Sequence, residues 1–74
     1  MKTSLSICQY YPNGDIVLFE CNCSPTAFAM KHINSTSFFD IMRCTDSRSN
    51  RSIEYVGSVG STLAYEKYLK MKES

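Results

Sequence analysis

The sequence VLFECNCSPT at residues 17–26 has the same pattern as IEYVGSVGST at residues 53–62. In both stretches apolar residues alternate with other residues, as in a strand that buries one face. Both then end in small residues that suit the start of a helix. We therefore predict that the chain runs twice through strand, strand and helix, in pseudo-repeats at residues 3–34 and 37–72.

Two such units can pair their hairpins in one sheet and bury one face of it. The predicted fold class is α+β: a ββαββα pseudo-repeat that forms a four-stranded antiparallel sheet with two helices packed on one face. At 74 residues, we expect one small domain, residues 1–74. A chain this short buries only about 60% of the surface that its unfolded form exposes, so its stability would gain from oligomerisation.

The first hairpin is predicted from the turn sequence YPNGD at residues 11–15. Proline and glycine fit a three-residue loop that ends in a left-handed residue. This loop pairs Tyr10 with Ile16 and Ile7 with Phe19. One side of the hairpin then carries a continuous apolar set: Leu5, Ile7, Val17, Phe19, Cys21 and Cys23.

The other elements follow from caps and alternation. Ser24 is a good N-cap, and Pro25 suits the first helical position. We predict a first helix at residues 25–33, strands at 38–44 and 52–59, and a second helix from 62 to about 71. By analogy with the first unit, five side chains of the second unit should face the core: Phe39, Ile41, Ile53, Tyr55 and Val59.

Composition argues against several classes of protein. The chain is 43% hydrophobic and 20% charged with a net charge of +1, which is atypical of disordered or strongly nucleic-acid-binding proteins. Residues 3–9 are too polar for a secretory signal. No apolar run approaches the roughly 18 residues of a membrane-spanning helix. We therefore expect a cytoplasmic protein with no membrane partner.

The four cysteines are expected to be reduced, because no export signal is recognised. Cys21 and Cys23 should share a face of their strand, whereas Cys8 and Cys44 should lie on the other face. A structural zinc ion needs four ligands together, so we predict buried apolar cysteines, no metal and no other cofactor.

No catalytic group is predicted. His32 is the only histidine, and no sequence spacing holds a thiol beside it. The glycine-containing segment at residues 57–62 lacks the lysine of a phosphate-binding loop and is interpreted as the start of a helix. We therefore expect the protein not to be an enzyme.

The outer face of the predicted sheet is unusually apolar, since the face opposite the helices should be mostly polar. An exposed apolar set usually marks an interaction surface. The sequence thus favours a small protein-interaction module, an adaptor or inhibitor, that binds a protein partner or forms a homodimer. A phage or mobile-element accessory protein would fit this description. The predicted partner-binding residues are Tyr10, Ile16, Leu18, Phe38, Met42 and Val56.

The alternative function is nucleic-acid binding. Three arginines lie near the second hairpin and could contact a polyanion beside sheet aromatics: Arg43, Arg48 and Arg51. Three acidic residues on the predicted outer face oppose this function: Glu20, Asp40 and Glu54. Nucleic acid is therefore the second choice of partner.

Overall fold

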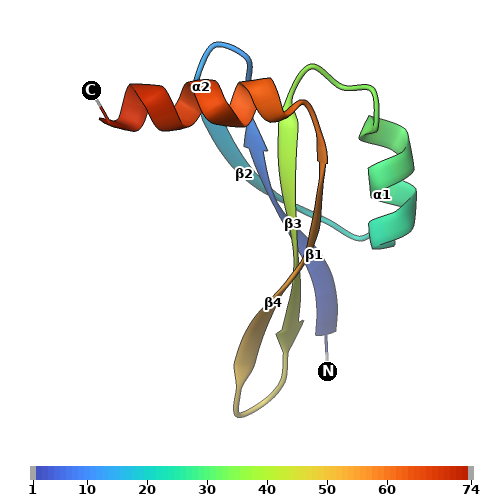
Figure 1. Cartoon of the computed structure of the whole chain (residues 1–74). Helices are drawn as coiled ribbons and strands as arrows, with labels where there is room; N and C mark the ends of the chain where they lie inside the picture. The colour runs from blue at the N-terminus through green and yellow to red at the C-terminus, as the bar shows by residue number, and fades with distance from the viewer. Residues whose placement is uncertain (1, 74) are drawn as a thin grey trace.

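The computed structural model describes residues 2–73 and confirms the α+β fold with element order ββαββα (Figure 1). Met1 and Ser74, at the ends of the predicted domain, lie outside the described residues. The strands form one antiparallel sheet in the order β2-β1-β3-β4. The elements are β1 (Lys2–Tyr10), β2 (Ile16–Cys21), α1 (Pro25–His32), β3 (Phe38–Asp46), β4 (Arg51–Gly60) and α2 (Thr62–Glu73).

The register predicted for the first hairpin is confirmed. Tyr10 pairs with Ile16, and Ile7 pairs with Phe19. In the turn, the Tyr11 N–H donates to the Asp15 carbonyl at 2.8 Å. Gly14 has a φ of +94°, the left-handed conformation that the loop requires and that glycine adopts without a steric penalty.

The N-cap of α1 is also confirmed. Ser24 is extended, with φ −76° and ψ 151°, and its hydroxyl accepts a hydrogen bond from the Ala27 N–H at 3.1 Å. This bond satisfies one of the N–H groups that a helix leaves unpaired in its first turn.

The prediction that both helices pack on one face of the sheet is wrong. Helix α1 places Phe28 in a core cluster on one face, which also contains Leu5, Ile7, Phe39 and Ile41. Helix α2 places Ala64 in a second cluster on the opposite face, together with Cys8, Tyr10 and Phe38. Strand alternation separates these two sets, since neighbouring residues point to opposite faces. We call the two surfaces the α1 face and the α2 face.

The exit from β4 is the physical reason for this difference. Gly60 has a φ of +103°, and a Cβ atom there would overlap the Ser37 carbonyl oxygen. The next residue, Ser61, donates its N–H to the same carbonyl at 2.9 Å. This close approach turns the chain directly into α2, which crosses one end of the sheet (Figure 1).

A bulge in β4 overturns a second prediction. Gly57 pairs with Ile41 and Tyr55 pairs with Met42, so Val56 has no partner in β3. Because the extra residue reverses the alternation, Ile53 and Tyr55 lie on the α2 face instead of the predicted α1 core. Val59, beyond the bulge, pairs with Phe39 and stays with the α1 cluster.

Candidate interaction surface

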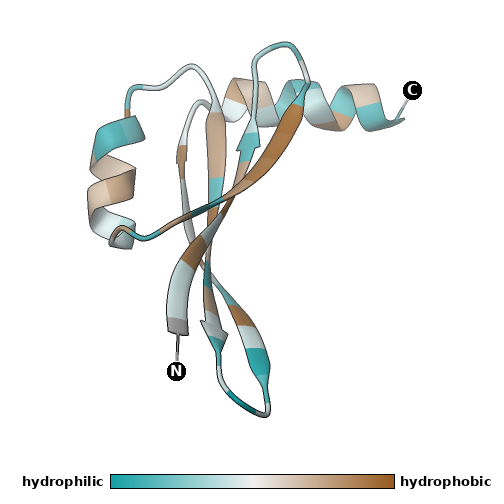
Figure 2. Cartoon of the chain, turned by 180° about the vertical axis from the view of Figure 1, so that it is seen from behind, coloured by the Kyte–Doolittle hydropathy of each residue, from teal (hydrophilic) through white to brown (hydrophobic). Residues whose placement is uncertain are grey.

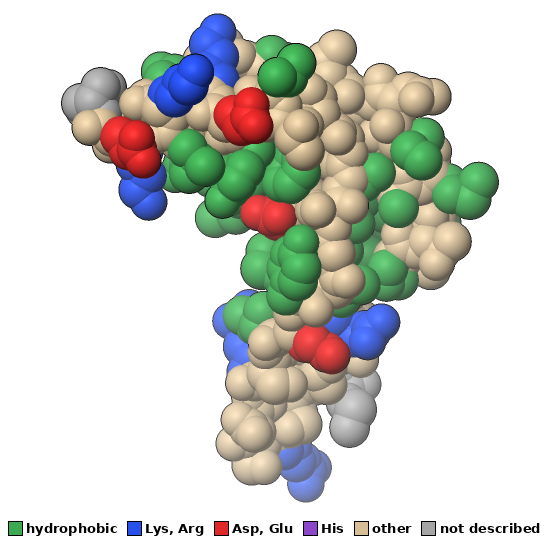
Figure 3. Space-filling view, viewed as in Figure 1, with side chains coloured by type: hydrophobic (Ala, Val, Ile, Leu, Met, Phe, Trp, Pro, Cys, Tyr) green, Lys and Arg blue, Asp and Glu red, His purple; other side chains and the backbone are tan. Residues whose placement is uncertain are grey.

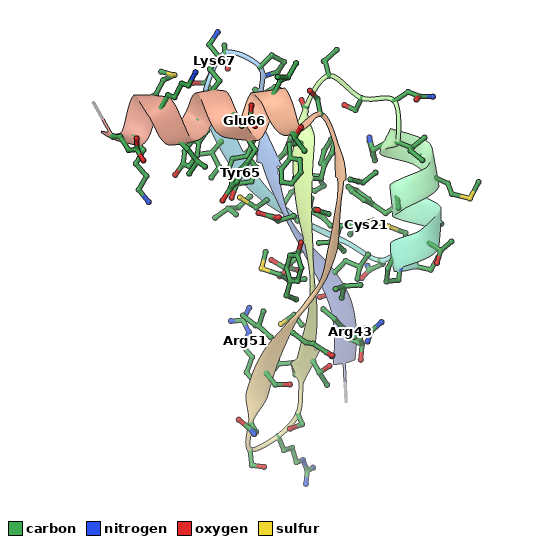
Figure 4. The ribbon with its side chains drawn as sticks, viewed as in Figure 1. Cys21, Arg43, Arg51, Tyr65, Glu66 and Lys67 are labelled. Carbon is green, nitrogen blue, oxygen red and sulfur yellow. A yellow bond between two sulfur atoms is a disulfide. The ribbon has the colours of Figure 1, made fainter. Side chains whose placement is uncertain are left out.

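Helix α2 covers the part of the predicted partner-binding face that contains Tyr10 and Phe38. Tyr10 and Phe38 are buried, and the Tyr10 ring lies 5.0 Å from both Tyr65 and Tyr68, measured between ring centroids. In Figure 4, Tyr65 extends from α2 towards the sheet. The prediction that Tyr10 and Phe38 are free to bind a partner is therefore wrong, because α2 crosses to their face and buries them.

Burial also changes the acidity of Tyr10. Removal of the phenol from water raises its pKa above the ordinary range, and hydrogen bonding with Cys8 and Asp40 acts in the same direction. The phenol is therefore held neutral within the packing beneath α2.

The rest of the predicted surface is only partly exposed. Leu18 is 72% exposed and Ile16 43% exposed, both on the edge strand β2. Figure 2 shows β2 as a largely hydrophobic ribbon. Met42 is half-buried on β3, and Val56 is exposed at the bulge.

The largest addition to this surface comes from residues that the sequence had assigned to the core. Ile53 is 59% and Tyr55 61% exposed, and both lie on β4 at the α2 face. Arg51 lies on the same face of β4, and its Nε–H donates to the Cys44 sulfur at 3.3 Å. We call Arg51, Ile53 and Tyr55 the β4 strip.

A local signal for this misassignment does exist. Gly57 interrupts the apolar alternation of β4, and an isolated glycine in a strand often marks a bulge. An added Cβ at Gly57 would meet nothing within 4 Å, so the glycine is not required by close packing.

The β4 strip lies along an open edge. Within residues 2–73, β4 pairs only with β3, which leaves the backbone groups on its other side without a strand partner. Unpaired strand edges can pair with another chain. The hairpin that carries β4 extends away from both helices, as the outline in Figure 3 shows.

The three arginines of the alternative prediction do not converge. Arg43 pairs with Leu5 of the α1 face and lies 3.8 Å from the Glu54 carboxylate, measured between Nη1 and Oε2. Arg51 lies on the α2 face, and Figure 4 shows the two arginines on opposite sides of the ribbon. Arg48 is exposed in the loop between β3 and β4.

The prediction of reduced cysteines is wrong for two of the four. Cys21 and Cys23 form a disulfide, whereas Cys8 and Cys44 are free and buried. Both bridged residues pack against the α1 cluster, as their predicted shared face requires. Strand β2 ends at Cys21, and the bend that follows brings their Cα atoms to 5.6 Å, within the range that a disulfide can span.

A pocket of about 320 Å³ lies beside this disulfide, between the end of β2 and α1. Phe19 and Phe28 supply apolar walls, and Glu20 of β2 and Lys31 and His32 of α1 also line it. The His32 ring packs against both Phe28 and Phe39 in tilted arrangements, with centroid distances of 4.5 and 4.6 Å. The fold thus brings the only histidine and a cysteine pair to one pocket, which the sequence spacing had not indicated.

The segment at residues 57–62 leads from strand into helix: residues 57–60 are the end of β4, and α2 begins at Thr62. The Ser61 N–H donates a hydrogen bond to the Ser37 carbonyl, and the Ser61 carbonyl accepts one from the Ala64 N–H at 3.2 Å. These bonds belong to the connection between β4 and α2.

Comparison with known proteins finds no matching family model, no matching curated protein and no matching solved structure. Across residues 2–73, no helix combines the length and apolar character needed to span a membrane.

Proposed function

We propose that this protein is a non-enzymatic interaction module, an adaptor or inhibitor, that pairs through the open edge of β4. The observation that supports this function most strongly is the β4 strip: Ile53 and Tyr55 are 59% and 61% exposed on a strand that has one unpaired edge among residues 2–73. The partner to which we commit is a second copy of the chain.

The sequence of β4 is self-complementary in one antiparallel register. If Ile53 lies opposite Ile53 of the second copy, Arg51 lies opposite Tyr55 of that copy on the same face. This arrangement buries the two isoleucines together and places each guanidinium beside an aromatic ring. The bulge at Val56 limits regular pairing to about five residues, on the geometry of strand ladders.

The neighbouring register is less favourable. A pairing centred on Glu54 would place two carboxylates directly opposite each other, and like charges across a strand pair are destabilising. The Arg43–Glu54 contact on the α1 face is compatible with the register centred on Ile53, which sets Glu54 opposite Ser52.

Nucleic-acid binding has weaker support. Its three arginines lie on two faces and in a loop, so they offer no continuous basic surface.

The test is self-association measured by sedimentation over a range of concentrations. We expect Ile53→Lys to weaken the dimer by about 30-fold or more, corresponding to about 2 kcal/mol, because two ammonium groups would meet at the centre of the pairing. Circular dichroism should remain unchanged, since Ile53 is largely exposed.

Leu18→Lys is the matched control, because Leu18 is also a largely exposed aliphatic residue on the same face but on β2. It should leave the dimer intact. Loss of the dimer in Leu18→Lys but not in Ile53→Lys would move the interface to β2. A chain that stays monomeric at all concentrations would reject homodimerisation.

A further inference from the structure

We propose that the Cys21–Cys23 disulfide is a thiol–disulfide exchange site for small anionic thiols. This inference is independent of the β4 edge, because both cysteines pack with the α1 cluster at the opposite edge of the sheet. The bridge and the pocket beside it are the two observations that support it.

The bridge is poorly placed to stabilise the fold. It closes over a single intervening residue, Asn22. Disulfide stabilisation grows with the length of chain enclosed, because the bridge acts mainly by restricting the unfolded state. The end of β2 is in addition already held by pairing of Cys21 with Leu5. Breaking the bridge should therefore leave the sheet and α1 in place.

The same spacing favours exchange. An incoming thiolate attacks one cysteine sulfur, the S–S bond breaks, and the other cysteine leaves as a thiolate. A second small thiolate then attacks the small-thiol sulfur of the mixed disulfide and releases the oxidised dimer of the small thiol. The two cysteine thiolates take up two protons from water, so two electrons pass from two thiols to the disulfide. In reverse, the neighbouring cysteine resolves the mixed disulfide within the chain, which is fast because the thiols are two residues apart.

The pocket defines the class of thiol. Its volume of about 320 Å³ is at the small end of ligand sites. Lys31 contributes a positive charge. Glu20 also lines the pocket, but strand alternation directs its side chain to the α2 face. A cation beside a cysteine favours the thiolate that leaves during exchange, and it also attracts an anionic thiol.

Cys8 and Cys44 provide an internal control. They are only 6% and 5% exposed, and both lie on the α2 face, beyond the reach of a thiol in this pocket. Any reagent that distinguishes accessible from buried thiols should therefore report on Cys21 and Cys23 alone in the folded protein.

The test treats the folded protein with thioglycolate, an anionic thiol, or with cysteamine, a cationic thiol of similar size. Alkylation and mass spectrometry then locate the free thiols. We expect reversible reduction of Cys21–Cys23, no labelling of Cys8 or Cys44, and an unchanged circular dichroism spectrum. Thioglycolate should react faster than cysteamine after both rates are corrected for thiolate concentration. Lys31→Gln should remove this preference.

The single variant Cys21→Ser sharpens the result, because Cys23 then has no resolving thiol beside it. After treatment with oxidised thioglycolate, this variant should keep a stable mixed disulfide, whereas the reduced wild-type chain should close its bridge. Three outcomes would overturn the proposal: reduction that requires denaturant, reduction that unfolds the chain, or a reduced pair that oxidised thioglycolate fails to close.

Discussion

The two ββα halves share a sequence pattern but place their helices on opposite faces of the sheet. In the first half, an extended Ser24 leads from β2 into α1 on the α1 face. In the second, Gly60 with φ +103° turns β4 directly into α2 on the α2 face. The pattern of apolar residues is thus compatible with a helix on either face, and the backbone at the strand exit decides between them.

The division also changes what each face can do. The α1 face is a packed core in which Ile7 and Phe39 are almost completely buried. The α2 face is covered only at one end, so the β4 strip remains in solvent. A true repeat with both helices on one face would have buried Tyr10 and Phe38 less and would have left no second core.

The largest loss of stability should come from removing a buried phenylalanine ring from one of the two core clusters. We expect Phe39→Ala to destabilise the fold by about 3–5 kcal/mol, because it removes a fully buried ring that contacts both Phe28 and His32. Phe38→Ala should cost less, because its neighbour Tyr65 is half-exposed and α2 can relax into the space. Urea unfolding measures both losses. An equal or larger loss for Phe38→Ala would mean that α2 is held as tightly as α1.

The next effect tests the turn that leads from β4 into α2 in the second half. Gly60→Ala should destabilise the protein by about 2–3 kcal/mol, because the new Cβ overlaps the Ser37 carbonyl and a left-handed residue is strained. Gly57→Ala is the matched control in the same strand, since its Cβ would enter open space. Thermal unfolding of both variants gives the comparison. If the two substitutions cost the same, the exit at Gly60 is not what directs α2.

The smallest effect concerns pH and the α2 core alone. Because burial raises the pKa of Tyr10, its neutral phenol stabilises the folded state fully below the unfolded value of about 10. Stability is then lost as the pH rises above 10 towards the folded pKa. In Tyr10→Phe, the alkaline loss measured by urea unfolding should be weaker. Tyr11→Phe, at an exposed turn residue, should leave the wild-type pH dependence unchanged.

Much of the local structure could be predicted because its causes lie within a few residues. The YPNGD turn determines the first hairpin register through Gly14, and Ser24 caps α1 through its own side chain. The order of elements and the antiparallel sheet follow from the same short-range chemistry and alternation.

Candidate site residues were harder to place, because their exposure depends on distant parts of the chain. Leu18 is 72% exposed, as predicted for the face of β2 on which it lies. Tyr10 and Phe38 are buried by α2, which lies more than 20 residues further along the chain. Ile53 and Tyr55 reach the surface through a bulge that only pairing with β3 defines.

The sequence alone therefore determined the turns, the cap, the order of strands and helices and the antiparallel pairing. The tertiary structure decided which face each helix covers, where the alternation of β4 reverses, and that Cys21 and Cys23 are bridged beside Lys31 and His32. Local conformation depends on side chains and backbone dihedrals close in sequence. The choice of face depends on how the whole chain buries its apolar surface, and both faces of this sheet offer enough of it to hold a helix.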